Sequence, residues 1–200
     1  MAKLAGFNKV FTKADDLKEF IDGLKWTAWR PRFIVLHNTG APNQKQWNDF
    51  LAKKGNTLLK RLGNFESFYR VNQKWKAGPH WFVSQQGWLM GTPSTQRGTH
   101  TPSWNAISLG IETVGDFDSD AFDDKTRDNV IHLLACLHAA LGIQPEPFEL
   151  GVRGLHFHKE DKATTHKHCP GKAVSKPDVV KRVADAIVAL DPGDHPAHVA

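Results

Sequence analysis

Short apolar runs alternate along this chain with segments of helical periodicity, and this alternation constrains the fold more than any other feature. The β-branched run at residues 32–36 predicts a buried strand that ends in the turn at 37–40. Further strands are expected at 80–83, 88–90, 107–114 and 150–158, the first two of them as a hairpin.

Helical segments separate these strands. Residues 12–15 carry a helix-start pattern, and Asn43 is expected to cap a second helix. The longest helical segment, 119–141, stops at Gly142, and a last helix opens at Ser175. Alternation of this kind predicts an α/β (mixed α+β) fold with a central mixed β-sheet flanked by helices.

The length of the chain suits one domain. With 200 residues, 40% hydrophobic and 24% charged, the chain can bury one sizeable core and has the composition of a globular protein. We expect a single domain over 1–200, with its core at about 30–190 and a short flexible tail at 191–200.

The chain carries a mild positive charge, +5 with a pI of about 9.2. The basic residues are scattered rather than clustered, which argues against nucleic acid as a partner. The N-terminus lacks the apolar core of a signal peptide, and no apolar run is long enough for a membrane span. Synthesis in the cytoplasm without a transmembrane segment is therefore expected.

Strong metal ligands occur at three places in strand ends and loops. His37 directly follows the apolar residues 33–36, and Cys169 lies in a polar loop. His156 and His158 are two residues apart, so in a strand they lie on one side. Two imidazoles and one thiolate would leave the fourth position of a zinc ion open for water. Taken singly, each histidine also fits an ordinary hydrogen-bonded role, and the cysteine also fits a Cys/His nucleophile.

Glu112 and Lys167 add a carboxylate and a cation to this set. One face of the predicted strand 107–114 is bulky and apolar, whereas the other carries two small residues and Glu112. A substrate can reach a carboxylate on such a face, although a solvent-facing residue has the same pattern. Lys167 precedes Cys169 by two residues and could steady an oxyanion in the same cleft; the alternative is a solvated lysine.

Taken together and in order, these motifs resemble the zinc-dependent N-acetylmuramoyl-L-alanine amidases that share the peptidoglycan-recognition-protein fold, particularly the phage endolysin type. The resemblance runs from about residue 33 to about residue 172. Its landmarks are FIVLHNTG at 33–40, GPHWFV at 78–83, GTH at 98–100, SWNAISLGIETVG at 103–115, HKED at 158–161 and THKHCPG at 165–171.

The resemblance implies one Zn²⁺ per chain, bound by His37, His158 and Cys169, in a single amidase catalytic domain. It implies that Glu112 is the general base and that Lys167 stabilises the transition state. The substrate would be peptidoglycan, cut between N-acetylmuramic acid and L-alanine.

Further residues are expected to line the substrate cleft: His80, His100, Trp104 and Asn105. Two departures from the family pattern affect the site. The stretch between His158 and Cys169 is longer than usual, which leaves His156 as an alternative ligand. Some relatives carry a tyrosine where this chain has Pro79, and the only tyrosine here is Tyr69.

A monomeric phage or prophage endolysin, released to the periplasmic cell wall by a holin-type protein, is the biological setting that the resemblance implies. Two other functions stay open from the sequence. One is a peptidoglycan-binding module of the same fold that does not cut its ligand. The other is a Cys/His amidase that uses Cys169 as its nucleophile.

Overall fold

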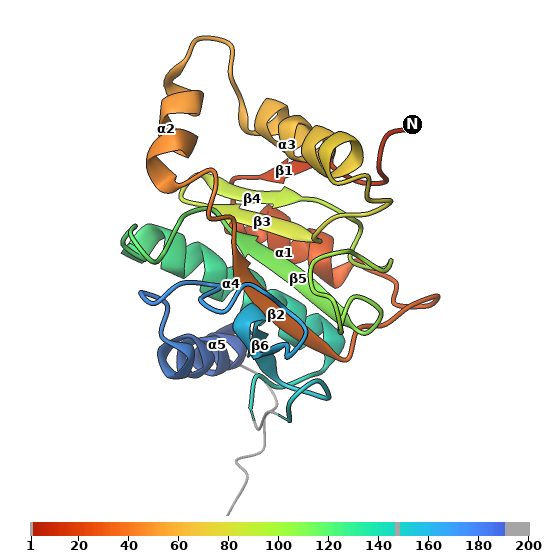
Figure 1. The fold of residues 1–200 in the computed structure, drawn as a ribbon. Coiled ribbons are helices and arrows are strands. Elements are labelled where there is room, and N and C mark those ends of the chain that lie inside the picture. Colours follow the sequence, from red (N-terminus) through yellow and green to blue (C-terminus); the bar gives the residue numbers. More distant parts are fainter. Residues whose placement is uncertain (1, 147–148, 191–200) are drawn as a thin grey trace, which may run out of the picture.

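A computed structural model describes residues 2–146 and 149–190, so the tail expected at 191–200 lies outside the described residues. Its strands form one sheet of order β1-β4-β3-β5-β2-β6 (Figure 1). They are β1 (Lys9–Phe11), β2 (Phe33–Asn38), β3 (Trp81–Ser84), β4 (Gly87–Met90), β5 (Ser108–Thr113) and β6 (Leu155–Phe157).

The sheet is mixed, as predicted. Strands β1, β4 and β3 pair antiparallel, whereas β3, β5, β2 and β6 pair parallel. The described helices are α1 (Ala14–Asp22), α2 (Gln44–Ala52), α3 (Leu58–Ser67), α4 (Asp124–Leu141) and α5 (Lys176–Leu190). A π-helical turn, η1 (Phe68–Asn72), continues α3, and a 3-10 turn, η2 (His158–Glu160), follows β6.

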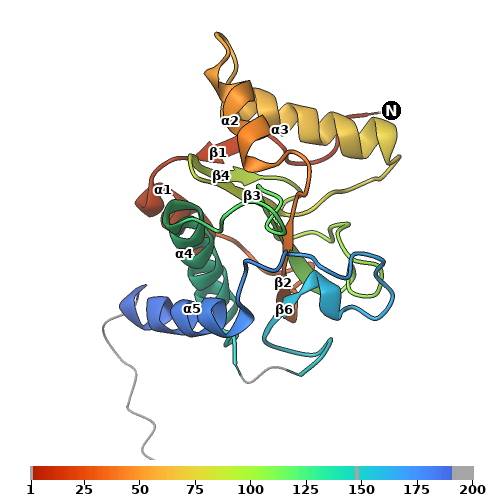
Figure 2. The ribbon, with the colours of Figure 1, turned by 60° about the vertical axis from the view of Figure 1, so that its left-hand side comes forward.

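One face of the sheet carries the main core. Helices α1, α4 and α5 lie along this face (Figure 2). Ile34 and Leu36 of β2, with Leu109 and Ile111 of β5, belong to the same buried cluster as the apolar residues of these helices. The apolar face predicted for the strand at 107–114 is therefore confirmed for Leu109 and Ile111. Ile107 lies just before β5 and packs instead, partly buried, against the separate cluster of Phe33, Val35 and Trp104.

The other face is only half covered by helices. Leu62 and Phe65 of α3 and Trp47 of α2 form a second cluster with Phe82 and Leu89 of the hairpin. Helix α3 therefore covers the antiparallel end of the sheet, and the ends of β5, β2 and β6 are left to loops (Figure 1).

Several local predictions are confirmed. Strands β3 and β4 form the predicted hairpin. Asn43 caps α2 with a capping box to Gln46, and Gly142 ends α4 in the left-handed conformation with φ of 61°. In addition to these confirmed predictions, the structure shows that Cys136 and Cys169 are both free and that Cys136 is buried in α4.

Other boundaries were predicted wrongly. Helix α4 begins at Asp124 rather than at residue 119, because Asp123 caps it through Thr126 and residues 116–120 form a separate turn. Helix α1 is preceded by Lys13, without a side-chain cap. The strand expected at 150–158 is shortened to β6 by the turn at 149–153. None of the described helices is both long and apolar enough to span a bilayer.

Candidate active site

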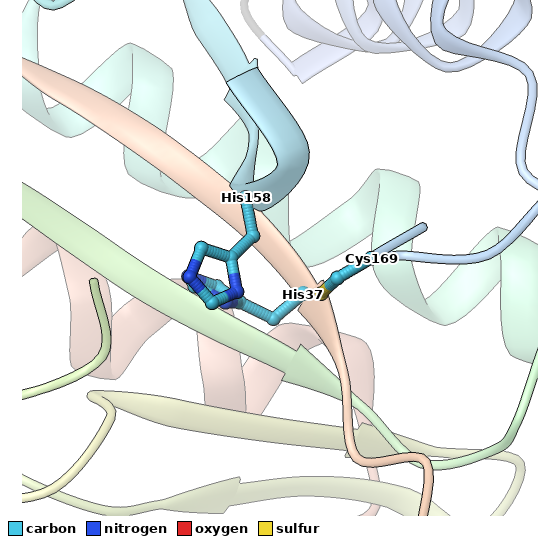
Figure 3. Close-up of side chains that lie close together, drawn as sticks. All are labelled: His37, His158 and Cys169. Carbon is cyan, nitrogen blue, oxygen red and sulfur yellow. The ribbon is translucent and has the colours of Figure 1, made fainter. Parts of the chain in front are cut away.

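Three side chains from separate parts of the chain meet at the ends of β2 and β6. His37 lies near the end of β2, His158 directly follows β6, and Cys169 lies in the loop after η2. All three are buried, and one potential ligand atom from each lies within 4.8 Å of the others (Figure 3). Because β2 and β6 are adjacent and parallel, the two imidazole rings lie side by side, with centroids 4.4 Å apart.

Hydrogen bonds decide which nitrogen of each histidine is left for a metal. The Nε2 atom of His158 lies 2.7 Å from Oγ1 of Thr164. The Nε2 atom of His37 lies 3.0 Å from Nδ1 of His100. Nδ1 therefore remains on both rings, and ligating histidines engage their second nitrogen in this way in protein metal sites.

Burial keeps the two imidazoles in the form that binds metals. Burial, followed by the charge of neighbouring imidazoles, lowers the pKa of His37 well below its usual value. Burial and His166 lower the pKa of His158 to about 4. Both rings are therefore neutral at physiological pH, as ligation requires.

Cys169 lies in a setting that suits a metal ligand better than a free nucleophile. Burial, and next the negative charge of Glu112, raise the pKa of its thiol. A cysteine nucleophile needs the opposite shift. A bound cation would supply the positive charge that a thiolate lacks here, and the backbone N–H of Asn38 already donates to Sγ at 3.4 Å.

Glu112 stands next to this cluster on β5. It pairs with His37 across the sheet, so the two side chains lie on the same face. Burial raises the pKa of Glu112 to about 8. Its buried Oε2 has no hydrogen-bond partner among the described residues. Burial of an unpaired carboxylate oxygen costs free energy unless a ligand, water or cation binds it. The unpaired oxygen of Glu112 therefore fits a metal site with room for a reactant.

A cavity of about 600 Å³ opens over the cluster and Glu112. Its far wall comes from α3 and the residues after it, and is largely aromatic: Phe65, Phe68, Tyr69 and Trp75. Arg61 lies on the same wall, with its guanidinium over the ring of Phe50 at 4.6 Å. Cavities of this size and composition bind small organic ligands.

Tyr69 brings a phenol to this cavity. It is buried and stacks on Trp75, with ring centroids 5.2 Å apart. Burial, and next the charge of Glu112, raise the pKa of Tyr69 well above its usual value. The hydroxyl of Tyr69 therefore keeps its proton at neutral pH.

Of the residues expected to bind substrate, His100 alone lines the cavity, and it stands behind His37. His80 is fully buried and hydrogen-bonded to Gln96 and Gly110. Trp104 packs edge-on against Phe33 of the sheet.

Asn105 has a local structural role. Its Oδ1 accepts from the backbone N–H groups of His100 and Thr101. The positions of His80, Trp104 and Asn105 therefore favour support of the loop at 98–107 over contact with substrate.

Lys167 lies outside the main cavity. Its exposed side chain donates to the carbonyl of Lys162 at 3.5 Å and borders a shallower hollow on the other side of Cys169. His166, its neighbour, lines the main cavity, with its ring 5.3 Å from that of His158.

His156, the alternative ligand, does not join the cluster. It is buried against Phe33 and Trp104, and its Nδ1 lies 3.4 Å from a carboxylate oxygen of Glu160. Of the two histidines, only His158 reaches His37 and Cys169.

The aromatic wall is the part of the site that the sequence reading missed, because no element was predicted between residues 52 and 79. A signal was present. Thr57 caps α3 by accepting from the N–H of Lys60, and Leu58, Leu62, Phe65 and Tyr69 then follow at helical spacing.

Known proteins resemble this chain in sequence and in fold. Residues 27–172 match the family of N-acetylmuramoyl-L-alanine amidases. No curated protein sequence gives a significant match.

Solved structures share the fold at low sequence identity. The endolysin amidase LysCS from Clostridium intestinale URNW is 17% identical, with a TM-score of 0.56 over 91% of this chain and 92% of that one. The Ph2119 endolysin from a Thermus scotoductus bacteriophage is 21% identical, with a TM-score of 0.54 over 90% and 91%. Drosophila peptidoglycan recognition protein SD is 23% identical, with a TM-score of 0.55 over 72% and 76%.

Proposed function

Because this chain belongs to the N-acetylmuramoyl-L-alanine amidase family, we propose that it is a zinc-dependent hydrolase that cleaves peptidoglycan between N-acetylmuramic acid and L-alanine. The observation that carries the proposal is the convergence of His37, His158 and Cys169 beside Glu112, under a cavity of about 600 Å³. Two neutral imidazoles and a thiolate are a donor set that zinc prefers.

Zinc held by these residues would polarise the scissile carbonyl and acidify a water molecule. Glu112 takes a proton from the water molecule. At the same time the oxygen of the water bonds to the lactyl carbonyl carbon. The proton then passes to the amine nitrogen of L-alanine as the C–N bond breaks. A zinc ion bound beside Glu112 would counter the burial that raises the pKa of this carboxyl to about 8, so that Glu112 is ionised before the attack and carries the proton between the two steps.

Two protein groups are proposed to stabilise the negative charge that develops on the carbonyl oxygen by donating hydrogen bonds to it. The phenol of Tyr69 lies on the cavity wall near Glu112. The ammonium of Lys167 lies outside the cavity, on an exposed side chain that donates to the carbonyl of Lys162 at 3.5 Å. Rotation of that side chain would be needed to bring it to the substrate.

The endolysin role is proposed from similarity to solved structures. LysCS and Ph2119, which share this fold over about nine tenths of the chain, are endolysins by name. We propose that the protein is encoded by a phage or prophage and acts as a monomer on the bacterial cell wall. A holin-type protein would release it to the wall.

The two rival functions are less well supported by the site. A receptor that only binds peptidoglycan has no use for a buried, unsatisfied carboxylate beside three convergent metal ligands. A Cys169 nucleophile would need a depressed pKa, whereas burial raises it.

Digestion of purified peptidoglycan sacculi, followed by mass spectrometry, tests the proposal. The expected products are free stem peptides that begin with L-alanine and glycan strands that have lost their stems. A chelator should stop the reaction and added zinc should restore it. Binding without new products would show a receptor, and inhibition by a thiol alkylator without any chelator effect would show a cysteine enzyme.

A further inference from the structure

His100 links the candidate ligand His37 to the backbone of β5. Its Nδ1 lies 3.0 Å from Nε2 of His37, and its Nε2 lies 3.2 Å from the carbonyl oxygen of Ser108. His37 and His100 are both buried, and their rings meet edge to face at 90°. The three groups form a continuous hydrogen-bonded chain beneath the cavity.

The carbonyl of Ser108 sets the direction of both hydrogen bonds in this series. A carbonyl oxygen only accepts, so Nε2 of His100 must carry a proton. In a neutral ring Nδ1 of His100 is then an acceptor, and His37 must donate from its own Nε2. Nδ1 of His37 is left without a proton, with its lone pair available for a metal.

The two partners of His100 set the roles of its nitrogens. A neutral His37 that binds a metal through Nδ1 carries its one proton on Nε2, so it donates to Nδ1 of His100. With Nε2 donating to the Ser108 carbonyl, the His100 ring has one donor nitrogen and one acceptor nitrogen.

The fold holds His100 in place from two sides. Its ring lies directly on Gly110 of β5, where an added Cβ would come within 2.2 Å of the ring. Its backbone N–H donates to Oδ1 of Asn105 at 2.7 Å. The neighbouring Thr101 donates from Oγ1 to Asp161 at 2.6 Å, which ties the loop to the turn after His158. These contacts favour a fixed ring over one that moves to meet substrate.

We infer that His100 is a positioning residue: it accepts the Nε2–H of His37 and thereby fixes the tautomer and ring orientation in which Nδ1 of His37 faces the metal. The inference rests on the metal site of the proposed function and replaces the expected contact of His100 with substrate. His158 has no such dictated partner, because the hydroxyl of Thr164 can donate or accept.

The first test reads the tautomers directly, without activity. In protein labelled with ¹⁵N at histidine, the nitrogen shifts should show His37 protonated at Nε2 and His100 protonated at Nε2 but not at Nδ1. A His100 ring protonated at Nδ1 would reverse the hydrogen bond and overturn the inference. The wild-type chain suffices for this measurement, so it does not depend on a variant that folds.

The second test measures zinc affinity by competition with a chromophoric chelator. His100→Phe keeps a ring on Gly110 but removes the acceptor, and zinc affinity should fall about 10–100-fold. His100→Asn places an amide oxygen near the position of Nδ1 and should recover most of the loss. His138→Asn, which changes a buried histidine on the opposite face of the sheet, should leave zinc affinity unchanged.

Zinc affinity of His100→Phe within about twofold of the wild type, in a folded protein, would overturn the inference. If His100 instead touches substrate, zinc-saturated His100→Phe would show a raised KM with unchanged zinc affinity. Both affinity and tautomers remain measurable if the chain proves not to be an amidase, so failure of the proposed function is distinguishable from failure of this inference.

Discussion

His37 and Glu112 face each other across the parallel pairing of β2 and β5, as register partners on one face of the sheet. Adjacent strands lie about 4.8 Å apart, so the sheet itself sets the spacing between the candidate metal ligand and the candidate base. No loop closure is needed to bring them together. Because metal binding is assigned to His37 and proton transfer to Glu112, mutation of each residue tests one role separately.

Glu112→Gln keeps the shape of the side chain and removes the base. We expect kcat to fall at least about 100-fold, because proton transfer from the attacking water is lost. Zinc content should remain one per chain, since Glu112 is not among the three clustered ligands. Glu19→Gln, on the exposed side of α1, is the matched control and should turn over normally. Near-normal kcat in Glu112→Gln would refute its role as the base.

Cys169→Ala should abolish zinc-dependent stabilisation. At zinc concentrations about 100-fold above Kd, the wild type should gain about 2.7 kcal/mol and melt roughly 5–10 °C higher than in chelator. Cys136→Ala removes the other free cysteine, which is buried in α4 away from the cluster, and should keep the zinc-dependent shift. An equal shift in Cys169→Ala would remove this residue from the ligand set.

Tyr69→Phe and Lys167→Met rank the two proposed donors to the transition state. Loss of one such donor costs about 10²–10³ in kcat. Tyr69 lines the cavity whereas Lys167 is turned toward Lys162, so Tyr69→Phe should lower kcat more than Lys167→Met. The reverse order would mean that the lysine moves into the cavity when substrate binds.

Arg61→Met tests the wall opposite the metal ligands. The guanidinium stacks over Phe50, and its buried Nε has no hydrogen-bond partner among the described residues. A carboxylate of the stem peptide would satisfy it, so KM should rise about tenfold while kcat is nearly unchanged. Substrate with amidated stem carboxylates should show no such difference. Lys53→Met, an exposed cation on the neighbouring hollow, is the control.

Acid should destabilise the protein partly through His138. This histidine is buried in α4 and donates from Nδ1 to the carbonyl of Ile143, and burial lowers its pKa to about 4. The neutral ring therefore contributes stability that is complete above the unfolded pKa of about 6.5 and is lost as the pH falls toward 4. The full loss is on the order of 3 kcal/mol.

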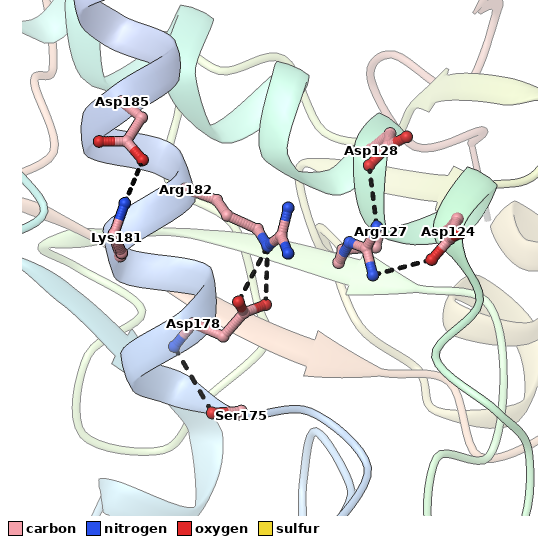
Figure 4. Close-up of polar contacts among 8 residues, drawn as sticks. All are labelled: Asp124, Arg127, Asp128, Ser175, Asp178, Lys181, Arg182 and Asp185. Carbon is pink, nitrogen blue, oxygen red and sulfur yellow. Dashed lines mark hydrogen bonds and ion pairs between the residues drawn. The ribbon is translucent and has the colours of Figure 1, made fainter.

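Urea unfolding in the presence of chelator, from pH 7.5 to 4, measures this effect. His138→Asn should give a shallower fall in the free energy of unfolding with acid than the wild type. Arg182→Gln breaks an exposed ion pair with Asp178 on α5 (Figure 4) and should leave that slope nearly unchanged. Equal slopes in the wild type and His138→Asn would show that His138 is not kept neutral by the fold.

Sequence patterns predicted the parts of the fold that depend on neighbouring residues. The alternation within 107–114 separates a core face from the face of Glu112, and Asn43 and Gly142 mark helix ends through local hydrogen bonding and backbone geometry. The start of α4 was misplaced because the aspartates before it bond to the turn at 116–120 instead of extending the helix.

His37, His158 and Cys169 were named from residue type and family resemblance, but their meeting depends on the tertiary structure. Only the pairing of β2 with β6 brings His158 rather than His156 to His37, and only the packing of α3 places Tyr69 and Arg61 opposite them. Spacing along a chain constrains side chains within one element, whereas distances between elements are set by strand order and core packing. Local patterns were therefore enough for most of the elements, although not for β1 or α3, and for the kinds of chemical group, because both depend on neighbouring residues. Which groups meet, and which imidazole nitrogens are left for a metal ligand, depends on contacts between elements that are far apart in the sequence.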